Sequence, residues 1–344
     1  MSHHTLTEIR SQPAAWQQAL ERVRARAGQL TSLANRDYEQ VIFTGCGSTY
    51  YLSLAAAALF QELTGRPARA VPGGELLLNS DTVVGRIGNP PNKTLLVAIS
   101  RSGTTTETVR AVEQFKAQGR GPVIGITNYD TTLAGLADEA VIIPAGQEES
   151  VAQTRSFASM YVAATAFAAQ IAGREDLLEG MEGLSVVGER LIGQYEAFAR
   201  ELGENLNFDR FYFLGSGARY GLACEVNLKM KEMTLTHSEP FHFLEFRHGP
   251  MSMVNERAVV VGMVSDKNSA HERKVLAEMR ALGGTILSLA ETDADVVFAS
   301  GIPEPVRGVL YLPVLQLMAF YRALAKGLNP DRPANLTAVV KLDL

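Results

Sequence analysis

The chain has 344 residues, 46% of them hydrophobic and 20% charged, which is typical of a globular protein with an ample core. Because this length exceeds that of a single ordinary core, we expect two domains. A net charge of -5 without a basic stripe argues against a nucleic-acid partner, and the two distant cysteines, Cys46 and Cys224, suit a reducing cytoplasm without a disulfide framework.

No membrane partner is expected from the sequence. The N-terminal segment has no apolar signal core, and the most apolar helical stretch, residues 160–172, is shorter than the roughly 20 residues that a membrane span needs. We therefore expect a buried helix there.

The first half of the chain alternates between strand and helix patterns. After an amphipathic helix over residues 12–33, entered through Pro13, the sequence predicts strands at residues 41–44, 68–71, 94–99, 123–127 and 140–143. Helices are predicted over residues 50–63, closed by Gly65, and from Thr106 to Gly119. This alternation is typical of a parallel, doubly wound sheet.

The stretch Ser100-Arg-Ser-Gly-Thr-Thr105 lies between a predicted strand and a predicted helix. Such a turn directs backbone N–H groups and hydroxyls at a helix N-terminus, where the helix dipole favours an anion. The turn has no lysine and lacks triphosphate-loop spacing, so a phosphate monoester is the expected anion, with Arg101 available to add charge. The alternative is that these hydroxyls only cap the helix, although a cap needs one hydroxyl and the turn offers Ser100, Ser102, Thr104 and Thr105.

The second half repeats this organisation after a long helix and a helical connector over residues 177–206. A strand, a Gly-x-Gly turn and a helix recur at residues 210–217, and Gly215 lies 170 residues after Gly45, which predicts an internal duplication. The further elements predicted in this copy are strands at residues 258–264 and 285–289 and helices over residues 219–233, 270–282 and 310–328.

The sequence argues against two further ligand sites, a phosphate site in the second copy and a dinucleotide-binding site. The turn Ser265-Asp-Lys-Asn268 in the second copy lacks the hydroxyl pattern of the first, so we expect no phosphate site there. A dinucleotide cofactor is not expected, because the third glycine of G-x-G-x-x-G falls at Tyr50 and Tyr220.

A second group of ionisable residues occupies the region from Glu225 to Pro250. Glu225, Lys229 and Glu232 fall on one face of a predicted helix, a row that on an isolated helix is typical of a solvated, salt-bridged face. The following residues, His237 to Pro250, contain three histidines and two carboxylates and are predicted to form a loop that holds an acid or base against an apolar floor. No H-E-x-x-H motif or cysteine pair occurs, so no metal is expected.

Together these motifs resemble the sugar isomerase (SIS) family of phosphosugar enzymes. The motifs are the two strand, Gly-x-Gly and helix units, the turn at residues 100–105, Val151-Ala-Gln-Thr-Arg-Ser-Phe157, and Glu232 followed by Glu245-Phe-Arg-His-Gly-Pro250. More narrowly, the chain is similar to the isomerase half of glucosamine-6-phosphate synthase, to SIS-type glucosamine-6-phosphate deaminases and to fructosamine-6-phosphate deglycases. The similarity covers nearly the whole chain and begins with Thr7-Glu-Ile-Arg-Ser-Gln-Pro13.

The resemblance implies two α/β domains with doubly wound parallel sheets of flavodoxin-like order. The expected divisions are a helical segment at residues 1–34, a phosphate-binding SIS domain at 35–175, a helical connector at 176–206, an SIS domain with the catalytic loop at 207–330, and a tail at 331–344.

The resemblance also implies roles for individual residues. The catalytic residues would be Glu232, which moves a proton between C1 and C2, Lys229 beside it, and His248, which opens the sugar ring from the other protomer of a homodimer. The phosphate-binding residues would be Ser48, Ser100, Arg101, Ser102 and Thr105, and the substrate cavity would include Gly47, Val151, Gln153, Glu225 and Lys341.

Two departures from the synthase narrow the expected reaction. We expect no reaction with glutamine, since no glutaminase domain or N-terminal cysteine nucleophile precedes the isomerase region, and Ala338 falls where the synthase has its Schiff-base lysine. The expected function is therefore that of a cytoplasmic, cofactor-free isomerase or deaminase acting on an amino-sugar 6-phosphate. The alternatives are a fructosamine-6-phosphate deglycase and a non-catalytic phosphosugar-binding regulator.

Overall fold

The protein, described here by a computed structural model covering residues 3–85, 93–340 and 342, folds into two compact units. The first-sheet unit comprises Ala14–Glu148, Arg155–Glu182 and the tail from Thr337. The second-sheet unit comprises the N-terminal residues to Pro13, Glu149–Thr154 and Gly183–Leu336. Each unit has a parallel sheet of five strands, so the expected α/β class is confirmed.

The sheet of the first-sheet unit has the strand order β2-β1-β3-β4-β5, and every pairing is parallel. Its strands are β1 Gln40–Gly45, β2 Ala68–Pro72, β3 Thr94–Ser100, β4 Val123–Thr127 and β5 Glu139–Ile142. β3 is buried along its whole length, as expected for the central strand of a parallel sheet that is covered on both faces.

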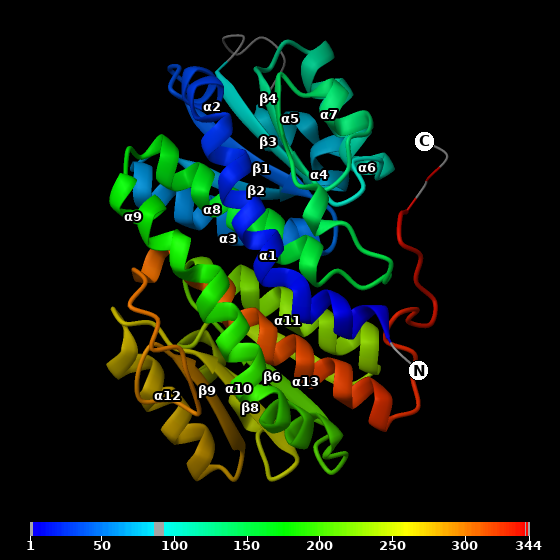
Figure 1. Cartoon of the computed structure of the whole chain (residues 1–344), viewed down its shortest axis with the longest axis vertical. Coiled ribbons are helices and arrows are strands. Elements are labelled where there is room, and N and C mark those ends of the chain that lie inside the picture. Colours follow the sequence, from blue (N-terminus) through cyan, green and yellow to red (C-terminus); the bar gives the residue numbers. More distant parts are fainter. Residues whose placement is uncertain (1–2, 86–92, 341, 343–344) are drawn as a thin grey trace. The chain divides into compact units, whose positions relative to one another are not determined.

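Helices cover both faces of this sheet (Figure 1). α3 packs against α8 on one face, and α4, α6 and α7 pack together on the other. The helices of this unit are α2 Ala27–Ala34, α3 Ser48–Thr64, α4 Gly73–Leu78, α5 Ser80–Val84, α6 Thr106–Ala117, α7 Thr132–Leu136, α8 Arg155–Ile171 and α9 Glu175–Gly180. The 3-10 turn η1 Pro144–Gly146 follows β5, and the 3-10 turn η2 Met181–Gly183 follows α9. The stretch at residues 160–172 is buried within and just after α8, as predicted.

The sheet of the second-sheet unit has the order β7-β6-β8-β9-β10, which is the same topology in the second copy. Its strands are β6 Arg210–Leu214, β7 His237–Phe241, β8 Ala258–Met263, β9 Thr285–Ala290 and β10 Val296–Val297. The Gly-x-Gly turns also match, since Gly47 and Gly217 have nearly the same backbone angles, φ 57° and 59°. Topology and turn geometry thus confirm the predicted duplication.

In this second unit, α11 and α13 cover one face of the sheet with α10 outside them, and α12 covers the other (Figure 1). The bounds are α10 Leu184–Glu204, α11 Ala218–Thr234, α12 Ser269–Ala281 and α13 Leu312–Ala325, with 3-10 turns η3 Glu245–Arg247, η4 Pro250–Met253, η5 Glu304–Val306 and η6 Gly308–Tyr311. One stretch among the described residues, Gly308–Ala325, is apolar and long enough to cross a membrane, but 89% of it is buried inside the structure, as in a core helix of a globular unit.

The prediction that a helix begins at Pro13 is wrong. α1 runs from His4 to Ala25 and contains Pro13 in its interior. A proline there removes the N–H that the carbonyl of Ile9 would accept. That carbonyl instead accepts a hydrogen bond from Gln12 Nε2 at 2.9 Å, so the missing donor is replaced by a neighbouring side chain.

The prediction of a loop from His237 to Pro250 is partly wrong, because His237–Phe241 forms β7. β7 pairs only with β6 and lies at the edge of its sheet, where Pro240 is tolerated because a proline there need not donate to a ladder on both sides. The remaining residues form η3 and η4, joined by the irregular residues His248 and Gly249.

Close packing of α10 on α13 depends on Gly203. A Cβ atom built on Gly203 would lie 2.4 Å from the carbonyl oxygen of Met318, whereas one on Gly193 of the same helix would meet nothing within 4 Å. We expect Gly203→Ala to destabilise the protein by about 1–3 kcal/mol through overpacking. Gly193→Ala is the matched control and should stabilise by roughly 0.5–1 kcal/mol through helix propensity. Thermal melts of both variants test this, and equal melting temperatures would contradict the packing.

Candidate functional site

The hydroxyls of the Ser100 turn converge at the start of α6, in the first-sheet unit. Ser100 ends β3 and is buried, and its Oγ lies 3.4 Å from the Oγ1 of Thr105, the residue that precedes α6. Ser102 Oγ accepts hydrogen bonds from the N–H and the hydroxyl of Thr104, at 3.2 and 3.1 Å. The helix terminus has no side-chain cap from Thr105. The hydroxyls therefore bond within the turn and do not cap α6.

The backbone of this turn is fixed by glycine and threonine. Gly103 has φ 65°, and a Cβ atom there would lie 2.3 Å from Thr131 Oγ1, so only glycine fits. Thr131 Oγ1 donates to the carbonyl of Ser102 at 2.5 Å, and Gly103 N–H donates to Ser100 Oγ at 3.1 Å. These bonds hold the turn in one shape before any ligand arrives.

The first Gly-x-Gly turn lies at the same edge of the sheet, because β1 and β3 are parallel neighbours. Gly47 precedes α3 with φ 57°, and Ser48 is the first, buried residue of that helix. The strand order reverses between β1 and β3, and at such a switch point ligands bind at the carboxyl ends of the strands. Gly47, Ser48 and the Ser100 turn thus share the position that this topology favours for a ligand.

Arg101 does not extend into solvent from the turn, as its side chain is only 7% exposed. It donates to the carbonyl of Ala338 in the tail at 2.6 Å and lies 3.8 Å from Glu148, whose side chain is fully buried. The tail also contacts the start of α6, where the N–H of Thr106 donates to the Val340 carbonyl at 3.4 Å. Lys341, the other expected tail residue, lies outside the described residues.

Glu148 is a residue that the sequence did not identify as part of this region. It occurs in the polar run Gln147-Glu-Glu-Ser150, which looks like a solvated loop in sequence. Its Oε2 accepts a hydrogen bond from the hydroxyl of Ser156, at the start of α8. No local pattern marks such burial, because Arg101 is distant in sequence and Ser156 lies beyond the loop, at the start of α8.

In the second copy, the corresponding turn is occupied by a carboxylate of the chain itself. Glu272 of α12 accepts hydrogen bonds from the N–H and the hydroxyl of Ser265, at 2.6 and 2.9 Å. Arg219 of α11 pairs with Glu272 at 3.2 Å and with Glu304 at 2.7 Å. These contacts support the expectation that the second turn does not bind phosphate.

Glu225, Lys229 and Glu232 form a connected charge cluster on α11, in the second-sheet unit. Lys229 Nζ lies 3.3 Å from Glu225 Oε1 and 2.7 Å from Glu232 Oε2. Glu225 and Lys229 are buried, so the solvated face typical of an isolated helix is not what forms, whereas the Glu232 side chain is 19% exposed. Burial by itself lowers the pKa of Lys229, but the two carboxylates more than offset this and raise it above its usual value. Lys229 therefore stays charged and holds Glu232 in place.

The histidines that follow α11 have different surroundings. His242 stacks on Tyr220 with ring centroids 3.9 Å apart, and burial lowers its pKa. His237 and His248 are exposed, and His248 follows η3 directly. Phe243 and Phe246 of the same segment are buried in the core beneath, so an apolar floor is present but the histidines do not lie within it.

Val151 and Gln153 lie in the second-sheet unit, between η1 and α8. Val151 N–H donates to the carbonyl of Asp331 at 2.9 Å. The side-chain oxygen of Gln153 is buried and accepts no hydrogen bond from the described residues. An unsatisfied buried acceptor of this kind is costly unless a ligand or water supplies a donor.

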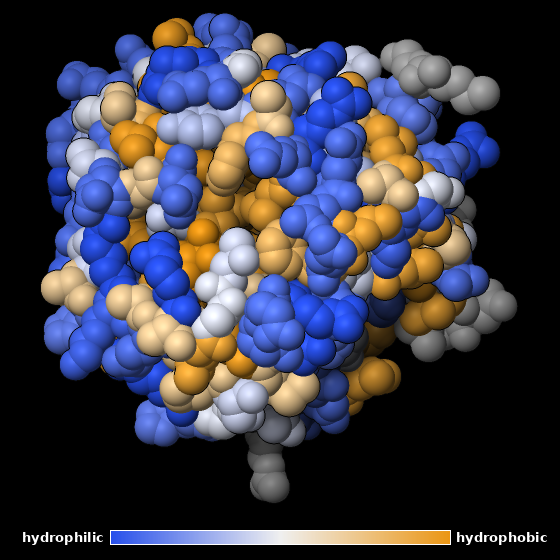
Figure 2. Space-filling model, turned by 90° about the horizontal axis from the view of Figure 1, so that it is seen from below, coloured by the Kyte–Doolittle hydropathy of each residue, from blue (hydrophilic) through white to orange (hydrophobic). Residues whose placement is uncertain are grey.

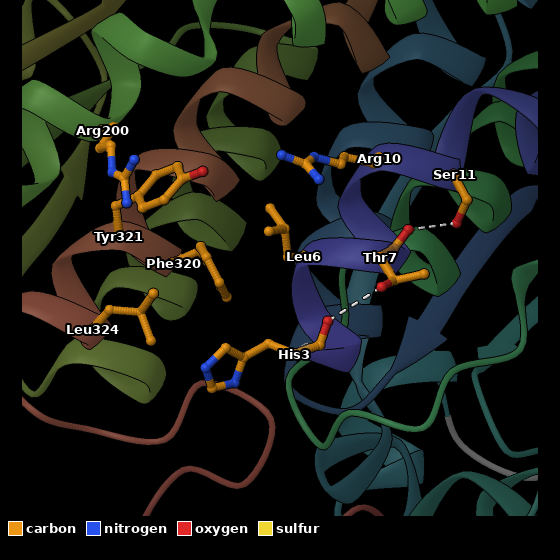
Figure 3. A pocket seen from close by; sticks show the side chains of 9 residues that line it. All are labelled: His3, Leu6, Thr7, Arg10, Ser11, Arg200, Phe320, Tyr321 and Leu324. Atoms are coloured by element: carbon orange, nitrogen blue, oxygen red, sulfur yellow. Dashed lines mark hydrogen bonds between the residues drawn. The ribbon is translucent and has the colours of Figure 1, made fainter. Parts of the chain in front are cut away.

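A hollow within the second-sheet unit contains none of the expected site residues. It measures about 640 Å³ and lies along α1, α10 and α13, with Arg10, Arg200 and Tyr321 among its lining side chains (Figure 3). Arg10 pairs with Glu196 at 2.6 Å, and burial with the bond to Glu196 raises the pKa of Tyr321 to about 12. Because its arginines are already paired, we do not regard this groove as the candidate site.

Comparison with known families finds one match that spans both units. A model of the SIS domain family matches residues 32–170 and 207–319. The glutamine–fructose-6-phosphate aminotransferase (isomerizing) of Pyrococcus horikoshii is 30% identical over 355 residues, covering 99% of this chain and 58% of that protein. The chain thus spans somewhat more than half of this relative's length.

Solved structures show the same fold over nearly the whole chain. A glucosamine-6-phosphate deaminase from Thermotoga maritima is 26% identical, with a TM-score of 0.80, and covers 98% of this chain and 100% of that one. A tagatose-6-phosphate ketose/aldose isomerase from Escherichia coli, 24% identical, gives a TM-score of 0.85 with coverage of 97% and 96%.

The charge cluster on α11 predicts that the free energy of unfolding depends strongly on the ion pair between Glu225 and Lys229. Lys229→Met leaves Glu225 buried without its cation, which we expect to destabilise the protein by about 3–5 kcal/mol. The double variant Glu225→Leu with Lys229→Met removes both buried charges and should recover most of that loss. Thermal melts of the two variants test this, and a double variant no more stable than Lys229→Met would show that the pair is not coupled.

Proposed function

The chain belongs to the SIS domain family, and on this basis we propose that it is a phosphosugar enzyme that moves a proton between C1 and C2 of an amino-sugar 6-phosphate. The observation that carries the proposal is the partly exposed carboxylate of Glu232, held 2.7 Å from the buried ammonium of Lys229. A base that serves two adjacent carbons must reach the substrate yet keep a fixed position, and this pair provides both.

We propose that the Ser100 turn binds the phosphate of the substrate. The hydroxyls of Ser100, Ser102 and Thr105, with Ser48 and the backbone at Gly47, would donate hydrogen bonds to it at the N-termini of α3 and α6. Charge-assisted hydrogen bonds to phosphate are strong, so this contact would supply much of the affinity. Arg101 would add positive charge and, through Ala338, connect the tail to the bound phosphate.

In the proposed reaction, the Glu232 carboxylate takes the proton from C2 of the open-chain aldose, the electrons of the C2–H bond form the C1=C2 double bond of an enolamine, and the carbonyl oxygen on C1 takes up a proton from water. The same carboxylic acid then returns its proton to C1 while the amine on C2 loses a proton to water, which gives the imine of the ketose. Water then adds to the imine carbon and ammonia leaves, so that the products are the ketose 6-phosphate and ammonia. Val151, Gln153 and Glu225 would line the substrate cavity, and the unsatisfied oxygen of Gln153 is suited to accept a substrate N–H or O–H.

We further propose that His248 opens the sugar ring in a homodimer, acting on the substrate of the other protomer. A neutral histidine can transfer the hydroxyl proton that ring opening requires. His248 is exposed here, and the exposed hydrophobic residues Leu244 and Met253, 51% and 53% accessible, flank it in sequence. Hydrophobic residues also reach the surface on the face drawn in Figure 2. Exposed apolar side chains beside a functional residue are typical of a subunit interface.

The second candidate is a fructosamine-6-phosphate deglycase. It is favoured by Glu245-Phe-Arg-His-Gly-Pro250 and by Ala338, whose backbone rather than side chain contacts the phosphate turn. A non-catalytic sugar-phosphate sensor is the alternative of another class, and it would not need Glu232 and His248 together. Two free cysteines, Cys46 and Cys224, fit the proposed cytoplasmic location.

The main test is an assay of sugar 6-phosphates and 6-phospho-ketosamines for release of ammonia, free amine and ketose. In deuterated water, the wild type should incorporate solvent deuterium at C1 or C2. Glu232→Gln should abolish this incorporation while phosphosugar binding stays within a few fold, because the amide keeps the shape but cannot accept the proton. Lys231→Gln, an exposed neighbour on the same helix, is the control. Persistent exchange in Glu232→Gln would assign the base to another group.

The shared homodimer site predicts complementation between inactive variants. Glu232→Gln and His248→Ala should each be inactive alone, but a mixed dimer has one site with both wild-type residues. Random reassociation gives about half heterodimers, each with one active site of two, so activity should recover to roughly a quarter of wild type. No recovery after verified subunit exchange would place both residues in a site built from one chain.

A further inference from the structure

We propose that Glu8 is a positioning residue whose buried carboxylate fixes the segment from Glu149 to Gln153, and through it the contribution of Val151 and Gln153 to substrate binding. The proposal rests on the proposed function for what those two residues contact. The contacts of Glu8 itself are independent of that function.

Glu8 lies on the second turn of α1 and is only 3% exposed. Its Oε1 accepts hydrogen bonds from the N–H groups of Glu149 and Ser150, at 2.7 and 3.2 Å. Its Oε2 accepts the hydroxyl of Ser150, which is itself 2% exposed. One carboxylate thus binds three donors of two consecutive residues, which fixes both the position and the direction of the chain entering Val151.

A second contact holds the other side of the same segment. The carbonyl of Asp331 accepts the N–H of Val151 at 2.9 Å. The carboxylate of Asp331 accepts the N–H and the hydroxyl of Thr5, at 2.8 and 2.7 Å, and the N–H of His4 at 3.1 Å, and so caps the start of α1. Val151 is therefore fixed by two groups that are connected to α1. Glu8 of α1 binds the preceding residue, Ser150, and Asp331 binds both Val151 and the first residues of α1.

These contacts give a role to the motif Thr7-Glu-Ile-Arg-Ser-Gln-Pro13, which the proposed reaction does not otherwise use. Gln12 replaces the hydrogen bond lost at Pro13, as described above, and so keeps α1 continuous. Thr7, Arg10 and Ser11 of the same motif line the groove of Figure 3. Of the charged residues in the motif, Glu8 contacts the 149–153 segment and Arg10 pairs with Glu196.

The test compares Glu8→Ala and Glu8→Gln with Arg10→Gln, which breaks the ion pair to Glu196 on the same helix. Hydrogen–deuterium exchange is measured for peptides covering residues 147–153, together with KM and kcat for the best phosphosugar of the panel and the inhibition constant of inorganic phosphate. We expect faster exchange at residues 149–151, a KM raised by about tenfold in Glu8→Ala and less in Glu8→Gln, and kcat within about threefold. The inhibition constant of phosphate should not change, because the Ser100 turn is intact.

Unchanged exchange in a folded Glu8→Ala protein would overturn the proposal, and so would faster exchange with an unchanged KM, since Glu8 would then be only structural. If Glu8→Ala does not fold, Glu8→Gln and Ser150→Ala carry the same test.

If the wild type turns over no phosphosugar, the proposed function has failed. The affinity of the variants for glucosamine 6-phosphate, measured by calorimetry, then replaces KM. Equal affinities in Glu8→Ala and Arg10→Gln would again overturn the inference.

Discussion

The position of the Ser100 turn follows from the order of the parallel strands. With β1 between β2 and β3, the chain leaves β1 and β3 toward opposite faces of the sheet, and the turns that follow these two strands lie next to each other at their carboxyl ends. The same order in the second copy creates the same opening after β6 and β8. There, Glu272 supplies the anion from within the chain and Arg219 neutralises it. One duplicated geometry thus leads to two outcomes, and the difference lies in whether an internal carboxylate fills the turn.

The charge cluster on α11 depends on the balance between the desolvation of its buried charges and their mutual attraction. Burying Glu225 and Lys229 costs desolvation, which their mutual attraction offsets only when the geometry is close. Such a pair is a poor source of net stability, and a hydrophobic pair of similar volume would serve the core as well. Its retention is easier to understand if the buried ammonium is needed to hold the exposed carboxylate of Glu232. The free energy lost in burying the pair would then be the condition for holding Glu232, the proposed proton acceptor, in a fixed position.

The sequence predicted the parts of the molecule that depend on local pattern. Eight of the ten strands among the described residues, the duplication and the convergence of Ser100, Ser102 and Thr105 follow from hydrophobic runs and turn residues. The start of α1 was predicted wrongly because proline is common at the first position of a helix and is unfavourable in its interior, and the sequence does not show that Gln12 supplies the donor that Pro13 lacks. β7 was missed because Pro240 disfavours a strand unless that strand is at an edge, which only the tertiary structure decides. Glu8 and Glu148 look like surface residues in sequence, since their partners lie 141 and 47 residues away.

Binding and proton transfer place different demands on a site, and the proposed function assigns them to residues with different surroundings. The Ser100 turn is fixed by Gly103 and by backbone hydrogen bonds, so under this proposal it would bind the phosphate equally well throughout the reaction, which lowers KM without changing the barrier. Under the same proposal Glu232 exchanges a proton, and its contribution would be realised only in the transition state. The backbone segment at Val151 is held by neither group but by α1 and Asp331. Because these supports share no residues, substitutions in them should separate substrate affinity from chemistry, which is the physical reason why the kinetic and exchange measurements can distinguish their roles.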